Sequence, residues 1–247
     1  FRAYPNHRIL SIIFFRILCY SILLEFILIN TIVDVGFIHG DGFHGKGGML
    51  GFLRPYGFSG DPSTSSSIVI SFFYLVEIYK NKSSSIFDNI LLLFTVIISM
   101  STTSIIIYIL YLYFSGKLSM KYIIITMPAL SMFILLTFYN DSGTLQYYSI
   151  DYFLYVLDIK LSNISTFNDN LIVGDQIFSD TPTTASDFGW YNMFTAVGIL
   201  GLCIYFIGIY LLYGVNRKYL PVLFLLFFSS FHYPTAFMPT GQVLVAL

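Results

Sequence analysis

Residues 86–116 read IFDNILLLFTVIISMSTTSIIIYILYLYFSG and consist of two apolar runs with a small polar stretch, Ser99 to Ser104, between them. As one α-helix this segment would be about 45 Å long. As a tight hairpin it would form two helices that are each short for a bilayer core of about 30 Å. The choice decides the topology, because the two alternatives place the rest of the chain on opposite sides of a membrane.

The distribution of basic residues favours the hairpin. With one long helix, the basic residues after position 116 would lie across the membrane from Lys80 and Lys82. With a hairpin, the basic residues near the span ends all lie on one side: Arg2, Arg8, Lys80, Lys82, Lys117, Lys121, Arg217 and Lys218. Because basic residues favour the cytoplasmic side of a membrane, we predict the hairpin and an N-terminus inside the cell.

The composition indicates that lipid surrounds most of the chain. Of its 247 residues 56% are hydrophobic and only 10% are charged, whereas soluble domains carry about 25% charged residues. The net charge of −1 excludes a nucleic-acid binder that relies on a basic surface. Cys19 and Cys203 both lie in apolar runs, so we predict neither a disulfide scaffold nor a thiolate metal cluster. Because the sequence starts with Phe1 rather than Met, we expect a fragment of a longer membrane protein.

These observations predict an all-α fold: a polytopic integral membrane bundle that forms one domain over residues 1–247. About seven spans are expected, at 9–33, 63–79, the two halves of 86–116, 119–139, 188–214 and 219–237. Two large outer loops, 34–62 and 140–187, then share one side of the membrane. The second loop contains seven aspartates and a single basic residue, Lys160. The apolar spacing over 150–161 predicts an amphipathic helix at the membrane interface.

The most informative stretch outside the spans is RPYGFSGDPSTSSS, residues 54–67. Pro62 suits the first position of a helix, and Asp61 suits its N-cap. A helix N-terminus carries free N–H groups and a partial positive charge, and Arg54 adds a guanidinium suited to phosphate. The residues expected to approach a bound anion, through flexible backbone or hydroxyl donors, are Gly57, Gly60, Ser63, Thr64 and Ser65. The alternative interpretation is an ordinary capped helix with a surface arginine.

Two further residues are candidates for acid–base chemistry. Asp187 is either a general base that activates an acceptor hydroxyl or the N-cap of the span that follows it, and the two roles are compatible. His232 is either a packed, hydrogen-bonded residue or a second acid–base group. Arg16 and Glu25 interrupt the first span on roughly opposite faces, so they are not expected to pair. Each either reaches the membrane surface or has a role inside the bundle.

The glycine-rich loop 34–62 suggests other sites that we do not favour. His39, Asp41 and His44 have no recognised metal-ligand spacing. Residues 40–46 imitate a phosphate-binding loop, but Gly47 replaces the required Ser or Thr. Gly57 to Gly60 also match the Gly-x-Ser-Gly sequence of rhomboid-like proteases, with His232 as a candidate base, yet Ser59 precedes the span instead of lying inside it.

Taken together, several motifs resemble the bacterial O-antigen polymerase and O-antigen ligase superfamily. The pattern Arg-x-x-Gly-x-x-Gly-x-Pro starting at Arg54 is similar to its signature, and residues 187–201, DFGWYNMFTAVGILG, resemble the segment that opens the span after its large outer loop. The Ser99–Ser104 break resembles the turn of small residues in that family. The ligases commonly have a His-Asn pair where this chain has Asp187-Phe188, which favours a polymerase.

The resemblance implies a metal-independent membrane glycosyltransferase in the bacterial cytoplasmic membrane. It would polymerise polyprenyl-diphosphate-linked oligosaccharide repeat units into O-antigen or capsular polysaccharide, with a chain-length regulator as a further partner. Arg54 would hold the departing diphosphate, and Asp187 or His232 would accept the proton of the attacking hydroxyl. No metal or other cofactor is expected, because the lipid-linked donor is already activated. Two alternatives stay open: a ligase that transfers the glycan to a lipid core, and a polysaccharide transporter or flippase subunit.

Overall fold

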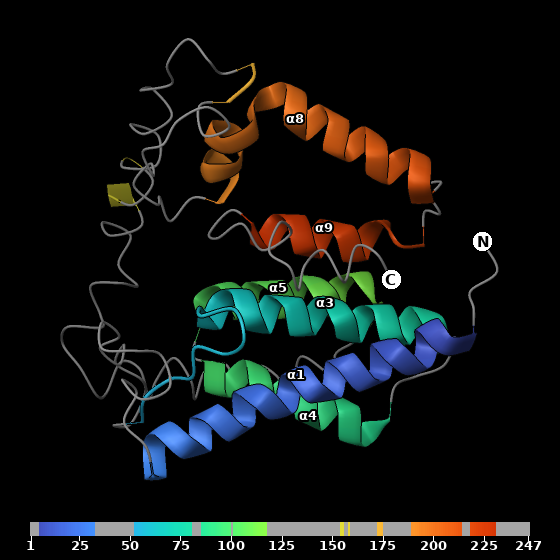
Figure 1. The fold of residues 1–247 in the computed structure, drawn as a ribbon. Helices are drawn as coiled ribbons and strands as arrows, with labels where there is room; N and C mark the ends of the chain where they lie inside the picture. The colour runs from blue at the N-terminus through green and yellow to red at the C-terminus, as the bar shows by residue number, and fades with distance from the viewer. Residues whose placement is uncertain are drawn as a thin grey trace.

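A computed structural model describes residues 5–32, 52–80, 85–99, 101–117, 154–155, 158, 172–174, 189–213 and 218–230. Within these ranges every regular element is a helix, which confirms the predicted all-α class for the described part of the chain (Figure 1). The helices are α1 (Pro5–Thr31), α3 (Pro62–Lys80), α4 (Ile86–Ser99), α5 (Thr102–Phe114), α8 (Gly189–Tyr213) and α9 (Leu220–Ser229).

The apolar segments of the sequence correspond to these helices. α1, α3 and α8 match the spans expected at 9–33, 63–79 and 188–214, and α9 covers the first part of 219–237. Among the residues that the structure describes, two helical segments, Ile9–Thr31 and Asn192–Leu211, are long and apolar enough to cross a membrane, and α4, α5 and α9 are shorter apolar helices. The span expected at 119–139 lies outside the described residues. So does most of the interfacial helix expected over 150–161, within which Leu154, Tyr155 and Asp158 are helical.

The hairpin predicted within residues 86–116 is confirmed. α4 ends at Ser99 and α5 begins at Thr102, with Ser101 as its N-cap. The Ser101 hydroxyl accepts a hydrogen bond from the N–H of Ser104, which satisfies one of the N–H groups left open at a helix start. α4 and α5 run in opposite directions in Figure 1, and both pack against α3. The helix therefore breaks between Ser99 and Thr102, and the other residues of the polar stretch belong to the two helices.

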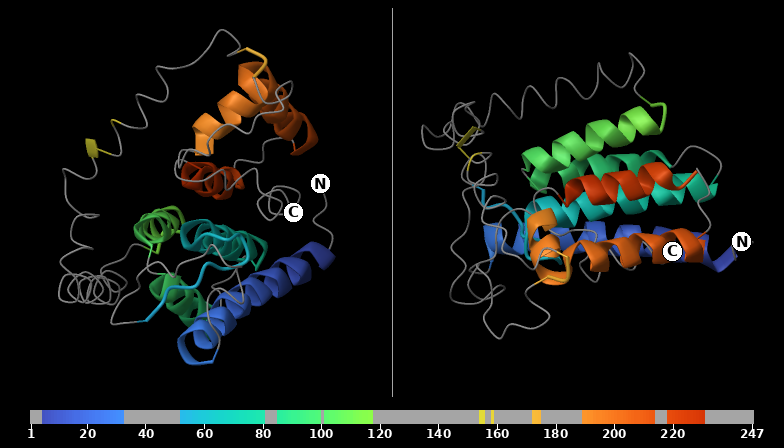
Figure 2. Two further views of the ribbon diagram at one scale, coloured as in Figure 1. Left: turned by 60° about the vertical axis from the view of Figure 1, so that its left-hand side comes forward. Right: turned by 90° about the horizontal axis from the view of Figure 1, so that it is seen from above.

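The helices define two ends of the bundle that differ in their side chains. Residues 52–61 lie at one end with the last turn of α1 and the starts of α3, α5 and α8, and we call this the loop end (Figures 1 and 2). The opposite end contains the last residue of α3, Lys80, together with Lys117 and Lys218, and we call it the basic end. This arrangement agrees with the expectation that these lysines share one side.

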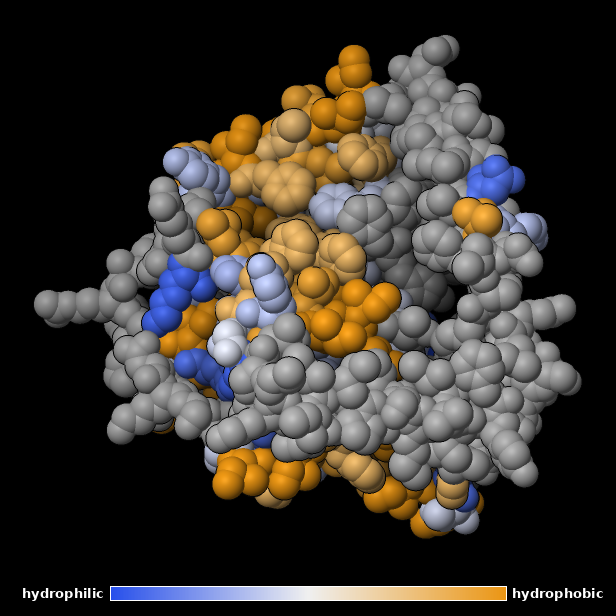
Figure 3. All heavy atoms as spheres, turned by 180° about the vertical axis from the view of Figure 1, so that it is seen from behind, coloured by the Kyte–Doolittle hydropathy of each residue, from blue (hydrophilic) through white to orange (hydrophobic). Residues whose placement is uncertain are grey.

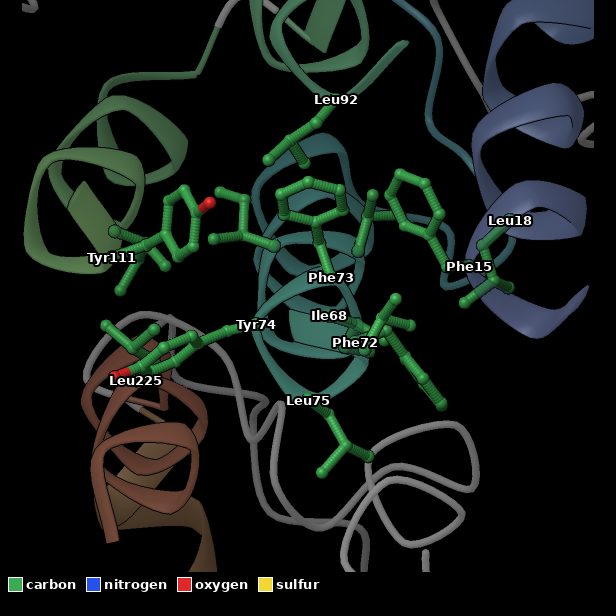
Figure 4. Packing of buried hydrophobic residues seen from close by; sticks show 14 of the residues in the cluster. Phe15, Leu18, Ile68, Phe72, Phe73, Tyr74, Leu75, Leu92, Tyr111 and Leu225 are labelled. Atoms are coloured by element: carbon green, nitrogen blue, oxygen red, sulfur yellow. The ribbon is translucent and has the colours of Figure 1, made fainter. Parts of the chain in front are cut away.

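The core is built around α3, which contacts α1, α4, α5 and α9. Figure 4 shows side chains from these four helices directed at α3, with Phe15, Leu92, Tyr111 and Leu225 on different sides of it. The centroid of the Phe73 ring lies 4.9 Å from the ring centroid of Phe15 on α1 and 5.7 Å from that of Tyr111 on α5. α3 is buried along almost its whole length, so it is the central helix of the described bundle.

The outer helices present large apolar side chains outward. On α1, Ile9, Ile13, Ile17, Leu24 and Ile27 are all exposed. α4, α5, α8 and α9 show the same pattern, and hydrophobic residues dominate the coloured surface in Figure 3. In water such a surface is unfavourable, whereas in a bilayer it contacts acyl chains. The exposed apolar surface and the two long helices support association with a membrane.

Ion pairs between residues that are at least partly buried connect the helices toward the basic end. Glu77 of α3 pairs with Lys117 just beyond α5, and the Tyr111 hydroxyl donates to Glu77 at 2.8 Å. Arg16 of α1 pairs with Asp88 of α4 at 3.0 Å, and the Asp88 side chain is 1% exposed. The sequence indicated no partner for Arg16, and it did not predict the roles of Glu77 and Asp88. These ion pairs tie α3 to α5 and α1 to α4.

We expect Lys117→Met to destabilise the bundle strongly, because it leaves the Glu77 carboxylate buried without its cation. Breaking one partner of a buried ion pair costs about 3–5 kcal/mol. Thermal unfolding of the purified protein in detergent measures the effect. Lys218→Met is the matched control, since Lys218 is exposed at the same end. Equal unfolding temperatures for the two variants would show that the Glu77–Lys117 pair contributes little.

Candidate functional site

The candidate site is the segment 53–60 at the loop end, which side chains of α1 hold in place. Asn30 binds Leu53 twice: its Oδ1 accepts from the Leu53 N–H at 2.7 Å, and its Nδ2 donates to the Leu53 carbonyl at 2.9 Å. Glu25 accepts from the N–H groups of Tyr56 and Gly57, one on each carboxylate oxygen, both at 2.7 Å. The segment is therefore fixed to α1 at two points.

Arg54 lies between these two points. Its side chain is half-buried, and its Nε atom has no solvent exposure. Pro55 follows it, and a residue before proline is restricted to extended backbone conformations. The backbone that presents the guanidinium is thus constrained by Leu53 on one side and by Pro55 and Tyr56 on the other.

A tight turn over residues 57–60 connects this segment to α3. The Gly60 N–H donates to the Gly57 carbonyl at 3.1 Å, and both glycines have left-handed backbone, with φ of 71° and 73°. At Gly57 a Cβ atom would come within 2.5 Å of Ser65 Oγ, whereas at Gly60 it would meet nothing within 4 Å. Gly57 is therefore required for close approach as well as for its φ, and Gly60 only for its φ.

The N-terminus of α3 already binds a carboxylate of its own chain. α3 begins at Pro62, and Asp61 Oδ1 accepts from the N–H groups of Ser63 and Thr64 at 2.9 and 3.0 Å. The predicted N-cap is confirmed. It also means that the donors expected to face an external anion are engaged with Asp61, whose negative charge opposes a second anion at that position.

The hydroxyls of the first turn of α3 point into the protein. Ser63 Oγ binds the Asp61 carboxylate, and Ser65 Oγ donates to the Tyr56 carbonyl at 3.0 Å. Ser65 Oγ also contacts Ser59 Oγ at 2.6 Å. Thr64 is buried, and its hydroxyl has no hydrogen-bond partner among the described residues. Ser63 and Ser65 thus use their hydroxyls to stabilise the turn.

A short part of the second polar segment, residues 172–174, packs against α8. The Leu200 N–H of α8 donates to the Ile172 carbonyl at 3.0 Å. α8 is kinked at Gly198, where φ is 64°, and a Cβ atom there would lie 2.6 Å from the nitrogen of Gly174. The two glycines therefore allow residues 172–174 to pack on the kink, and this contact connects the segment before α8 with the helix itself.

The two predicted acid–base residues, Asp187 and His232, lie outside the described residues, as do His39, Asp41 and His44. α8 begins at Gly189, two residues after Asp187, and this helix start lies at the loop end (Figure 1). The structure thus brings together Arg54, Gly57, Gly60 and Ser63–Ser65, and it places the start of α8 at the same end.

The sequence did not predict how Glu25 and Asn30 contribute to the site. Glu25 was recognised as a charge within an apolar run, and the structure confirms the alternative in which it acts inside the bundle. The isolated acidic residue was the only signal, because its partners are backbone groups.

No family model, curated protein or solved structure matches the chain.

The two glycines of the turn give a matched test of this geometry. Gly60→Ala should destabilise the protein by about 1–2 kcal/mol, the cost of left-handed backbone for a residue with a Cβ atom. Gly57→Ala should cost about 1–3 kcal/mol more, because its Cβ atom also overlaps Ser65. Thermal unfolding in detergent measures both. Equal losses would mean that the segment 53–57 does not lie against α3 as described.

Proposed function

We propose that this chain is the membrane domain of a glycosyltransferase that polymerises lipid-diphosphate-linked oligosaccharide repeat units, as its sequence motifs suggest. In this proposal about seven helices span the bacterial cytoplasmic membrane, and the loop end faces outward. The observation that supports it best is the placement of Arg54. The doubly anchored, proline-restricted segment that carries Arg54 lies at the end of the bundle opposite the lysines.

The charge distribution supports this orientation. Lys80, Lys117 and Lys218 lie at the basic end, which the preference of basic residues for the cytoplasmic side places inside the cell. Residues 52–61 and the start of α8 then face the compartment where the repeat units are joined. Both parts of the proposed site, the arginine turn and the segment that ends at Asp187, would open to the same side.

The proposed reaction transfers a glycan from one lipid diphosphate to another. A hydroxyl of the acceptor repeat unit attacks the anomeric carbon of the donor glycan, a glycosidic bond forms, and the bond from that carbon to the diphosphate oxygen breaks. Arg54 would stabilise the negative charge that develops on the departing diphosphate. Asp187 or His232 would take the proton of the attacking hydroxyl. Gly57, Gly60 and the first turn of α3 would support Arg54 instead of contacting the diphosphate themselves.

A polysaccharide transporter or flippase subunit is the second candidate, and one observation favours it. A transporter is expected to hold facing charges within its spans, and Arg16–Asp88 and Glu77–Lys117 are such pairs. Both pairs, however, include a residue near a helix end at the basic end: Asp88 is in the first turn of α4, and Lys117 follows α5. In a strain that lacks this protein, single repeat units that accumulate on the outer side of the cytoplasmic membrane would indicate a polymerase. Accumulation on the cytoplasmic side would indicate a flippase.

Arg54→Ala should abolish chain extension, because it removes the group proposed to hold the diphosphate. Arg54→Lys should also fail substantially, since an ammonium lacks the planar fork that binds phosphate through two hydrogen bonds. Both variants are expressed in the deletion strain, and the glycan length distribution is read on a gel alongside the protein level. Lys218→Ala is the control that removes a basic residue from the other end. Normal glycan lengths in Arg54→Ala would remove Arg54 from the mechanism.

The orientation is testable by cysteine labelling in intact cells. We expect Phe52→Cys, at an exposed position of the loop end, to react with a membrane-impermeant maleimide from outside. Lys218→Cys should react only after the cells are permeabilised. Both substitutions are made with Cys203, an exposed cysteine, replaced by serine. Labelling of both positions from the same side would contradict the proposed arrangement.

A further inference from the structure

We propose that Glu25 of α1 is a positioning residue that sets the place of the Arg54 guanidinium, a proposal that rests on the function above. Glu25 is 9% exposed although it lies in an apolar helix. Its carboxylate is directed at the backbone of a loop that is 31 residues away in sequence. A buried carboxylate is costly unless it is hydrogen-bonded, and these two N–H groups supply bonds to both of its oxygens.

The hydrogen bonds made by Glu25 and Asn30 lie on either side of Arg54 in the sequence. Glu25 fixes Tyr56 and Gly57, two and three residues after Arg54, while Asn30 fixes Leu53, the residue before it. Arg54 and Pro55 lie between these points, and proline fixes its own φ. The start of the Arg54 side chain therefore has little freedom. A side chain that starts from a fixed backbone has less conformational entropy to lose when it meets a transition state.

The carboxylate is chemically suited to this position, and an amide is not. Both partners, the N–H groups of Tyr56 and Gly57, are donors, so both oxygens of residue 25 must accept. In Glu25→Gln one oxygen becomes an NH₂ group that would face a backbone N–H. This nearly isosteric change removes one anchor of the loop without emptying the space that Glu25 fills.

Two variants and a control test how the anchors on α1 affect Arg54. Glu25→Gln breaks the anchor after Arg54, and Asn30→Ala breaks the anchor before it. If Glu25→Gln does not fold, Asn30→Ala still tests whether loosening this segment changes the function of Arg54. Ser21→Ala is the matched control: Ser21 lies one turn before Glu25 on α1, and its hydroxyl donates to Leu18 of the same helix.

The first readout is amide hydrogen exchange of the full chain in detergent. Glu25→Gln should speed exchange at Tyr56 and Gly57 by at least about tenfold, since loss of one hydrogen bond of about 1.4 kcal/mol raises local opening tenfold. Ser21→Ala should leave these amides unchanged. Exchange at wild-type rates in both Glu25→Gln and Asn30→Ala would overturn the proposal, because the loop would then not depend on α1.

The second readout is chain extension by purified, folded protein, with the lipid-linked repeat units extracted from the deletion strain as substrate. Loosening Arg54 should lower kcat by up to about a hundredfold, the loss caused by displacing a reacting group by about 1 Å. KM should change little, because the lost interaction is made mainly in the transition state. A merely structural role would reduce the yield of folded protein and leave its kcat unchanged.

The outcomes separate this proposal from the function on which it rests. Faster exchange together with a lower kcat supports Glu25 as a positioning residue. Faster exchange with wild-type kcat overturns it, even if Arg54→Ala is inactive. Wild-type chain extension by Arg54→Ala removes Arg54 from the mechanism and, with it, the positioning role of Glu25, whatever the exchange rates show. The proposed function itself is overturned only if the wild-type protein does not extend chains.

Discussion

A charged side chain inside an apolar helix bundle is stable only where the protein itself supplies its partner, and the described structure depends on this constraint. The acidic side chains within α1 and α4 are buried, that of α3 is largely buried, and each has an internal partner. Asp88 binds Arg16, Glu77 binds Lys117, and Glu25 binds two backbone N–H groups. The pairs join α1 to α4, α3 to the end of α5, and α1 to the loop before α3. Each charge thus specifies which helices are neighbours, in an environment where apolar contacts alone discriminate poorly between helices.

The central helix satisfies its polar side chains in a different way. The first half of α3 is rich in serine, yet the whole helix is surrounded by other elements. Ser66, Ser67 and Ser71 donate to carbonyls one turn earlier in the same helix, so their hydroxyls need no partner from outside. Ser66 also contacts Ser104 of α5. Small side chains of this kind let helices approach closely, while the large rings of Phe72 and Phe73 fill the space in the second half of α3.

The parts of this structure that were predictable from the sequence are those with a local or one-dimensional signal. Apolar length gave α1, α3 and α8, the Asp61-Pro62 pair gave the start of α3, and the basic residues gave the hairpin of α4 and α5. The Glu77–Lys117 pair was not predictable, because its members are forty residues apart and share no periodicity. The contact of Glu25 with the loop was harder still to predict, since a backbone partner leaves no pattern in the side chains. Within the candidate site, the sequence therefore indicated Arg54 and its turn but not what holds them.

The two ends of the bundle use their carboxylates differently, and this difference bears on the site. At the basic end each carboxylate is neutralised by a cation, so the paired charges hold each other in place. At the loop end Glu25 and Asp61 are stabilised by backbone N–H groups, which carry partial positive charge but no formal charge. Four backbone N–H groups thus contribute to holding these two carboxylates. The position of the loop therefore depends on the path of its own backbone, which presents these donors to α1 and to the start of α3.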